Sequence, residues 1–233
     1  MERLDYISII AGGKCKFNCS FCIGNDIREN NHPNISNKYI SFIECYGDMT
    51  DEISISGSTS DPYFIELDVH FTIKNRSRDF DLKTSLHTRN TKLTNKMMKL
   101  IEWYDELVLG IDETFNPDNF KFQNNKSIRF SIVITKENQH KFNREWLDNI
   151  SNKTGVNSFT FRPNVFEEFN DGFNTFMTNM KLLFPEERKY AYWFNYKDSY
   201  ITYWDNKEFS QNVRYLWNDG NITEDDEWKK LFK

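Results

Sequence analysis

Residues 6–22 read YISIIAGGKCKFNCSFC, and this stretch decides the fold. The run Tyr6-Ile7-Ser8-Ile9-Ile10 predicts a first β-strand, because it is short, largely apolar and rich in β-branched side chains. Directly after it come Cys15, Cys19 and Cys22, which are spaced C-x3-C-x2-C. A secreted disulfide scaffold would spread its cysteines along a short chain, so this cluster favours a metal site in a reducing compartment.

The composition is that of a globular protein with a sizeable core. The chain has 233 residues, of which 38% are hydrophobic and 16% aromatic, and its formal net charge is −5. A mildly acidic chain is a weak candidate for a general polyanion binder. The first ten residues lack the basic and apolar regions of a signal peptide, and no apolar run is long enough to span a bilayer. We therefore expect a soluble cytoplasmic protein.

Strand and helix patterns alternate over about two thirds of the chain. Residues 6–10, 53–57, 82–87, 107–111, 128–135 and 158–162 read as strands. Apolar side chains recur at helical spacing in the segments 39–46, 64–71, 93–104 and 142–150. This alternation predicts parallel βαβ units that curl into an open or partial barrel, with ligands bound at the carboxyl ends of the strands.

The pattern changes after about residue 165. Two aromatic runs, residues 190–196 and 200–204, flank Lys197-Asp198-Ser199 and predict a hairpin, and residues 213–217 predict one more strand. Thr223 and Asp226 resemble a capping box, which predicts a short terminal helix. We expect a core over residues 1–165 and a C-terminal extension over 166–233, packed on the core within one domain.

The three clustered cysteines suit an iron–sulfur cluster with one open iron. A tight loop can bring three thiolates to three irons of a cubane, which leaves the fourth iron free for another ligand. The alternative is a structural zinc site, with Cys45 or a histidine as fourth ligand. Such sites usually have two separated ligand pairs, and this chain has no second CxxC. Cys45 otherwise reads as a small buried hydrophobe or as a redox-active or hydrogen-donating thiol.

The spacing, Phe21 before the last cysteine and the position after a first strand resemble the radical S-adenosylmethionine (SAM) superfamily, over roughly residues 4–165. The resemblance implies an α/β fold, a partial (β/α)6 barrel, here with a small antiparallel, aromatic-rich C-terminal extension. It also implies an oxygen-sensitive [4Fe-4S] cluster on Cys15, Cys19 and Cys22, with SAM chelated to the open iron. In that family, reductive cleavage of SAM gives methionine and a 5′-deoxyadenosyl radical, which usually abstracts hydrogen from a substrate. An electron donor such as flavodoxin or ferredoxin is implied as a partner.

The segment that ends the second strand resembles a SAM-binding turn. It reads Ser56-Gly57-Ser58-Thr59-Ser60-Asp61-Pro62, a Gly-x-x-x-Asp-Pro variant that departs from the more common Gly-Gly-Glu-Pro. A glycine lets the backbone approach a ligand, while carbonyls and hydroxyls accept from an ammonium group. Asp61 either contacts SAM or only caps the next helix. The predicted cofactor contacts in this region are Phe21, Ser56, Gly57, Ser58, Thr59 and Asp61.

Polar residues also follow the later strands. By analogy with the family, Thr88, Asp112 and Thr135 face SAM, although Asp112 could instead be a helix N-cap. His87 is a candidate contact to substrate or SAM, or else a satisfied core histidine. Arg162 could bind a carboxylate or phosphate bidentately, or form a salt bridge with a loop acid.

Several functions fit these residues. The first hypothesis is a radical SAM enzyme acting on a small molecule or nucleotide. The alternatives are an activating enzyme that installs a glycyl radical in a partner protein, a peptide-modifying enzyme, and a non-catalytic metal-bearing module that binds nucleic acid. The nucleic-acid-binding module would use residues 74–99, which hold eight basic side chains and only two acidic ones. A charged outer helix face explains the same residues.

Overall fold

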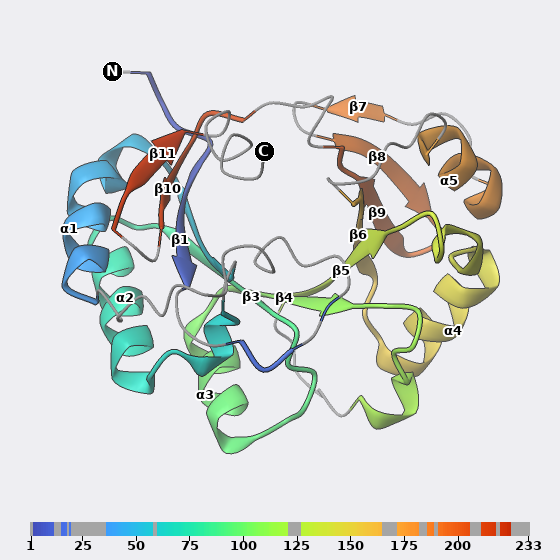
Figure 1. Cartoon of the computed structure of the whole chain (residues 1–233), viewed down its shortest axis with the longest axis horizontal. Coiled ribbons are helices and arrows are strands. Elements are labelled where there is room, and N and C mark those ends of the chain that lie inside the picture. The colour runs from blue at the N-terminus through green and yellow to red at the C-terminus, as the bar shows by residue number, and fades with distance from the viewer. Residues whose placement is uncertain are drawn as a thin grey trace. The chain divides into compact units, whose positions relative to one another are not determined.

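The chain folds into two compact units (Figure 1). The first contains residues 1–108 and 211–233, and the second contains residues 109–210. The structure is a computed structural model that describes residues 2–11, 15–17, 19, 36–57, 60–120, 127–164, 172–181, 186–188, 191–205, 211–217 and 220–224.

The first unit is built on a mostly parallel sheet in the order β11-β10-β1-β2-β3-β4. Its strands are β1 (Tyr6–Ala11), β2 (Glu52–Gly57), β3 (Lys83–Thr88), β10 (Val213–Leu216), β11 (Ile222–Glu224) and β4 (Glu106–Ile111), which runs on into the second unit. Strand β1 pairs in parallel with both β2 and β10, β2 pairs in parallel with β3, and β11 pairs antiparallel with β10. Ala11 pairs with Gly57, so the segments that follow β1 and β2 leave the same edge of the sheet.

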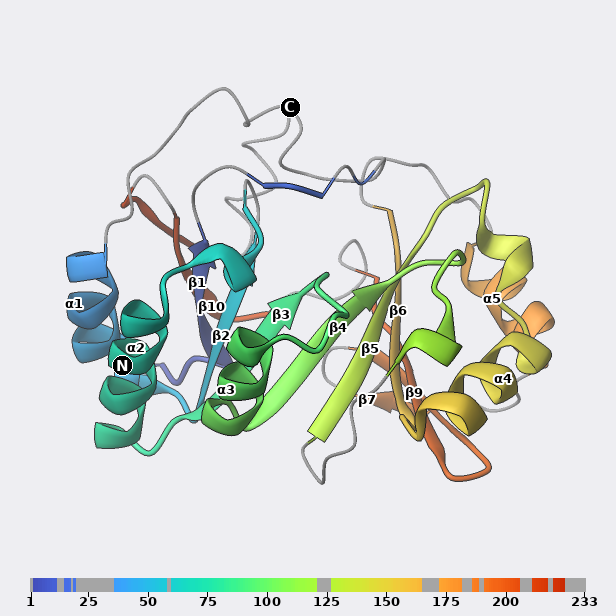
Figure 2. The ribbon, with the colours of Figure 1, turned by 90° about the horizontal axis from the view of Figure 1, so that it is seen from below.

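Three helices cover one face of this sheet (Figures 1 and 2): α1 (Ser36–Tyr46), α2 (Leu67–Asp79) and α3 (Asn95–Trp103). Short 3-10 turns, η1 (Gly47–Met49) and η2 (Pro62–Phe64), connect them to the strands. The alternation of Ile53 and Ile55 with Ser54 and Ser56 decides which face is covered. The isoleucines are buried, while the serines lie half-buried on the opposite face.

In the second unit the strand order is β5-β6-β9-β8-β7. Its strands are β5 (Ser127–Ile134), β6 (Ser158–Pro163), β7 (Glu186–Arg188), β8 (Ala191–Tyr196) and β9 (Ser199–Tyr203). Helices α4 (Arg144–Thr154) and α5 (Gly172–Met180) lie beside its sheet, with 3-10 turns η3 (Pro117–Asn119) and η4 (Gln139–Lys141). Asn143 caps α4 by accepting from Trp146 N at 3.0 Å, and Gly155 ends it at φ 73°.

Phenylalanine fills the core of the second unit. Phe130, Phe142, Phe159 and Phe161 are almost completely buried, and Phe176 of α5 packs on Phe161 with ring centroids 5.0 Å apart. Tilted and edge-on pairs of this kind add to the gain from burying apolar area. The high phenylalanine content of the sequence is thus explained by packing.

The predicted fold class is confirmed: a mixed α/β fold with a parallel core and an open sheet. All six predicted core strands are present, and residues 191–203 form the expected antiparallel hairpin of β8 and β9. The extension is nevertheless not wholly antiparallel, because β9 pairs in parallel with β6 and β10 with β1. The division of the chain at residue 165 stays a prediction.

Three sequence expectations need correction or addition. The helix predicted from Phe64 begins only at Leu67, because Asp61 and Pro62 start a 3-10 turn that contains Phe64. Thr223 lies in β11, where its hydroxyl accepts from Trp217 Nε1 at 2.7 Å, and the residues predicted to form a short terminal helix lie outside the described part of the chain. Helix α5 was not predicted. No helix among the described residues combines the length and apolar character of a membrane span.

Candidate functional site

The cysteine loop begins directly after β1. Cys15 and Cys19 are half-buried, and Phe17 N donates to Cys15 Sγ at 3.4 Å. An amide that donates to sulfur stabilises a thiolate, which is the ligand form of cysteine in iron–sulfur clusters. Phe21 and Cys22 lie outside the described residues. Among the described residues, no group of three His, Cys, Asp or Glu side chains could hold a metal ion. The thiols and the amide donor therefore fit a cluster ligand, while the three-cysteine set stays a prediction.

The cysteine loop packs against the turn that follows β2. The rings of Phe17 and Phe64 lie 5.8 Å apart, and Lys16 Nζ lies 5.3 Å from the centroid of the same Phe64 ring. Phe64 belongs to η2, which begins immediately after Asp61. The contacts bring two segments of the sequence, each predicted to bind a part of the cofactor, to the same edge of the first unit.

Gly57 ends β2 at a point with no room for a side chain. A Cβ at this position would lie 2.0 Å from the carbonyl oxygen of Ser60 and 3.1 Å from Pro62 Cδ. The chain turns back so tightly that the Ser60 carbonyl packs on the glycine backbone. Ser58 and Thr59, between them, lie outside the described residues. The glycine is thus required by the turn itself.

Asp61 joins this turn to the end of β3. Its Oδ1 accepts from Tyr63 N at 2.8 Å and from the Thr88 hydroxyl at 2.6 Å, while Oδ2 accepts from Arg89 N at 2.6 Å. Burial raises the pKa of Asp61, and the three hydrogen bonds oppose that effect. Asp61 caps a helical turn, as one of its two predicted roles required; a direct contact with SAM stays a prediction.

Thr88 is part of the same network and not an isolated ligand group. Its hydroxyl donates to Asp61 and accepts from Asn90 N at 3.0 Å. Arg89 and Asn90 were not predicted as site residues, although the polar run His87-Thr88-Arg89-Asn90 after a strand was a signal for them. Asp61 and Thr88 together fix the relative position of two neighbouring strand ends.

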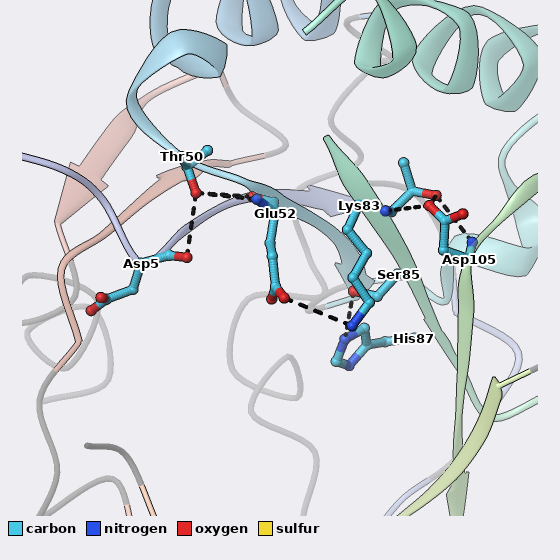
Figure 3. A network of polar contacts seen from close by, with 8 residues as sticks. Asp5, Thr50, Glu52, Lys83, Ser85, His87 and Asp105 are labelled. Atoms are coloured by element: carbon cyan, nitrogen blue, oxygen red, sulfur yellow. Dashed lines mark hydrogen bonds and ion pairs between the residues drawn. The ribbon is translucent and has the colours of Figure 1, made fainter. Parts of the chain in front are cut away.

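Small hydroxyl side chains line the face of the first sheet that the helices leave uncovered. Ser54 Oγ donates to Ser8 Oγ at 2.8 Å, and Ser8 lies 3.3 Å from the predicted contact Ser56. On β3, Ser85 Oγ and His87 Nε2 are 3.4 Å apart (Figure 3). His87 is half-buried on this polar face, so it is not a core histidine. Ser8, Ser54 and Ser85 were missed by the sequence reading, although their alternation with isoleucine or leucine marks them.

Lys83 and Glu52 form an ion pair at 3.7 Å near the start of their strands (Figure 3). Nearby, the Asp105 carboxylate accepts from both Thr84 N and Thr84 Oγ1 at 2.8 Å. These contacts lie away from the carboxyl ends of the strands. They order the sheet near the starts of β2, β3 and β4.

The predicted residues of the second unit form local turns. Asp112 Oδ1 accepts from Thr114 N at 3.0 Å and from its hydroxyl at 2.6 Å. The alternative role of Asp112 as a helix N-cap is wrong, because Asn116 caps η3. Thr135 and Asn138 exchange hydrogen bonds of 2.7 and 3.1 Å across the end of β5. Contacts of Asp112 and Thr135 with SAM stay predictions.

Arg162 lies half-buried on β6, on the same face as Thr160 two residues earlier. The Thr160 hydroxyl accepts from Arg129 at 3.2 Å and from Thr202 at 2.8 Å. This face of the second sheet therefore combines guanidinium and hydroxyl groups. Arg129 was not predicted as a site residue, and a substrate contact of Arg162 stays a prediction.

Cys45 is exposed on α1, so the expectation of a buried cysteine was wrong. The reason is its place on the helix. Tyr39, Phe42 and Ile43 form the buried face, and position 45 falls two residues past Ile43, outside that stripe.

Comparison with known proteins supports the fold directly. No family model and no curated protein sequence matches this chain. Among solved structures, Streptococcus suis SuiB bound to the precursor peptide SuiA matches with a TM-score of 0.61 at 13% identity, over 95% of this chain and 59% of SuiB. SuiB bound to S-adenosylmethionine matches with a TM-score of 0.59 at 12% identity, over 95% and 58%. AnSMEcpe with bound AdoMet and the Kp18Cys peptide matches with a TM-score of 0.54 at 12% identity, over 75% and 59%.

These neighbours are radical SAM enzymes, and the chain has their fold. It spans somewhat under two thirds of the length of SuiB and anSMEcpe. The resemblance read from the cysteine motif is thus supported by a likeness of structure that does not depend on that motif.

Proposed function

We propose that this protein is a radical SAM enzyme, with a [4Fe-4S] cluster held by Cys15, Cys19 and Cys22. The observation that carries the proposal is a C-x3-C-x2-C loop placed directly after β1 of a radical SAM fold. The half-buried thiol of Cys15, with its amide donor, supports the role of these cysteines as thiolate ligands. The cluster, once bound, supplies an open iron for SAM and the electron for its reductive cleavage.

The residues of the first unit prepare the place for SAM. Gly57 and the Ser60 carbonyl form a turn close to the cysteine loop, whose backbone oxygens can accept from the SAM ammonium group. Asp61 holds this turn against β3 through Thr88 and Arg89 N. Because the Asp61 carboxylate already accepts three hydrogen bonds, we propose that it positions the turn and that backbone carbonyls bind the cofactor.

The 5′-deoxyadenosyl radical formed from SAM would abstract hydrogen from a peptide substrate. Two of the matched structures, SuiB with SuiA and anSMEcpe with Kp18Cys peptide, contain peptides, which favours this class over the small molecule or nucleotide first expected. The hydroxyl groups of Ser8, Ser54 and Ser85 and the ring nitrogens of His87 offer hydrogen-bonding groups that suit a peptide. An oxygen-sensitive cluster also agrees with a reducing, cytoplasmic location.

The test follows the abstracted hydrogen. The reconstituted enzyme is reduced with dithionite and given SAM together with a fully deuterated substrate. In one set of reactions the substrate is a candidate peptide encoded beside the gene of the enzyme. In the other set it is a nucleotide. We expect 5′-deoxyadenosine to form and to acquire deuterium from a peptide. Label from a nucleotide alone would overturn the substrate class, and absence of 5′-deoxyadenosine would overturn the enzyme class.

A further inference from the structure

The carboxyl end of β6 brings a half-buried arginine to the part of the second unit where a ligand is expected. Arg162 is the next-to-last residue of β6 and stands between the buried residues Phe161 and Pro163. Ligands of open α/β sheets bind outside the carboxyl ends of the strands. Arg162 is therefore placed to contact a substrate.

The neighbours of Arg162 across the sheet are uncharged. On one side, Arg162 pairs with Val133 of β5. On the other side, Phe161 pairs with Tyr203 of β9. Trp204 N then donates to the Phe161 carbonyl at 2.8 Å, so Trp204 continues this ladder beside Arg162. Strands β5, β6, β8 and β9 contain no aspartate or glutamate, and these strands therefore bring only positive charge to the face that Arg162 occupies.

Trp204 adds a buried hydrogen-bond donor to this end of the sheet. Its indole nitrogen, Nε1, is shielded from solvent and has no hydrogen-bond partner in the described part of the chain. An indole N–H can only donate, and a buried donor without an acceptor costs about 1–3 kcal/mol. An acceptor that a ligand supplies next to Arg162 would remove this cost.

Hydrogen bonds order the same face two residues earlier along both strands. Thr202 Oγ1 donates to Thr160 Oγ1 at 2.8 Å, so these two hydroxyl groups lie on one face. Arg129 Nη1 donates to the same Thr160 oxygen at 3.2 Å. Because side chains alternate along an extended chain, Arg162 and Trp204 share this face with the two threonines. The guanidinium and the indole N–H can thus serve one ligand.

The acidic residues of the second unit have other roles or lie beyond the strands. Three of them form ion pairs with lysines: Glu113 with Lys141, Asp118 with Lys153, and Asp148 with Lys197. Asp205 directly follows Trp204 and is the acidic residue nearest to it along the chain. A guanidinium presents five N–H donors in a planar fork, and a bidentate carboxylate uses two of them.

We propose that Arg162 and the Trp204 indole bind a side-chain carboxylate of the substrate, so that the enzyme selects peptides that carry an aspartate or a glutamate. The inference rests on the proposed function, because that function supplies the peptide substrate. A carboxylate accepts two parallel hydrogen bonds from a guanidinium and keeps lone pairs for the indole N–H. The contact is non-covalent, and no bond is formed or broken in it.

The test selects peptides from a display library of random ten-residue sequences, with the full chain carrying its reconstituted cluster and SAM. The wild type is compared with Arg162→Gln, the charge-reversed Arg162→Glu and Trp204→Phe. Asp205→Asn is the control, because it removes a charge next to Trp204 and keeps both proposed donors. The most enriched peptide is then synthesised with an amidated C-terminus, once with its acidic residue and once with the corresponding amide residue.

We expect the wild type to enrich peptides that contain Asp or Glu, and to bind the acidic peptide about tenfold more tightly than its amide counterpart. Arg162→Gln should remove this difference, and Arg162→Glu should turn the preference towards Lys and Arg. Trp204→Phe should reduce the difference about threefold, while Asp205→Asn keeps it. The Kd for SAM and the formation of 5′-deoxyadenosine with dithionite should stay near wild type in all variants, which shows that they are folded.

A wild type that enriches no acidic peptides would overturn the proposed contact and leave the proposed function intact. An unchanged preference in Arg162→Gln would do the same. A Kd for SAM that rises tenfold in Arg162→Gln would assign the guanidinium to the SAM carboxylate and would also overturn the contact. Absence of 5′-deoxyadenosine in the wild type would overturn the proposed function instead.

Discussion

At the scale of single residues, Gly57 is a position in the candidate site where the structure leaves no space for a side chain. The carbonyl of Ser60 occupies the space that a Cβ would need, and the next residue, Asp61, is buried and hydrogen-bonded to Thr88 and Arg89 N. A methyl group at position 57 would push the turn away from β2 and displace its backbone oxygens. Those oxygens are the groups proposed to accept from the SAM ammonium, so a small steric change should act on cofactor affinity.

Gly57→Ala tests this argument. We expect the Kd for SAM, measured by equilibrium dialysis on the reconstituted enzyme, to rise about tenfold or more, with iron content close to wild type. Gly155→Ala is the control, because Gly155 has φ 73° but no atom within 4 Å of an added Cβ. It should cost about 1 kcal/mol of stability and leave SAM affinity unchanged. An unaltered Kd in Gly57→Ala would refute the role of the turn.

The residue scale also shows where sequence reasoning stopped. The pattern Gly57-x-x-x-Asp61-Pro62 predicts a turn, and the structure places one there. It does not reveal that the Asp61 carboxylate also accepts from the Thr88 hydroxyl and from Arg89 N, because these two contacts join residues 27 and 28 positions apart. Cys45 shows the converse error, since a cysteine one or two positions from an apolar stripe can fall on either side of its boundary.

At the scale of elements, His70 connects the 3-10 turn η2 to helices α2 and α3. It is fully buried on α2; its Nε2 is 3.0 Å from the Pro62 carbonyl and its Nδ1 is 2.7 Å from the Tyr104 hydroxyl. A carbonyl only accepts, so Nε2 carries the proton and Nδ1 accepts from Tyr104. The neutral ring thereby ties α2 and the end of α3 to the residue that follows Asp61.

Burial lowers the pKa of His70 from its ordinary value of 6.5 to about 4. The neutral form is favoured in the folded state, so its contribution is fully present above pH 6.5 and is lost as the pH falls toward 4. We expect the free energy of unfolding of the full chain, measured with urea, to fall by up to about 3 kcal/mol over this range from His70 alone. His70→Gln should be less stable at pH 7 and lose much of this pH dependence.

The exposed His140 provides the control, because His140→Gln removes a histidine without touching this network. If His70→Gln unfolds with the same pH dependence as the wild type between pH 6.5 and 4, the assignment of the neutral buried ring is wrong.

Elements were predicted best where periodicity is strong. The six core strands and helices α1, α3 and α4 follow from patterns of two or of three to four residues, which reflect one buried face. Helix α5 was missed even though Phe173, Phe176 and Met180 recur at helical spacing, because only a short pattern marks it. Strand β11 was not predicted, since the capping-box pattern that begins at Thr223 says nothing of the pairing of residues 222–224 with β10.

At the scale of the whole molecule, the sheet is extended by C-terminal strands. Strand β10 returns to pair with β1 in the first unit, and β9 pairs with β6 in the second. No local pattern predicts such pairings, because they join residues more than 40 positions apart, and those of β1 and β10 more than 200. The return of β10 also places Tyr215 beside Tyr6 at the start of the strand that leads to the cysteines.

The loop after this strand is proposed to hold, through Cys15, Cys19 and Cys22, a cluster whose open iron binds SAM. The most direct measurement is electron paramagnetic resonance of the anaerobically reconstituted, dithionite-reduced protein with and without SAM, made on the wild type, Cys19→Ala and Cys45→Ala. We predict a reduced-cubane signal in the wild type and in Cys45→Ala that changes when SAM is added, and no such signal in Cys19→Ala. A protein that binds zinc instead, or a Cys19→Ala variant with an intact SAM-responsive signal, would contradict the account.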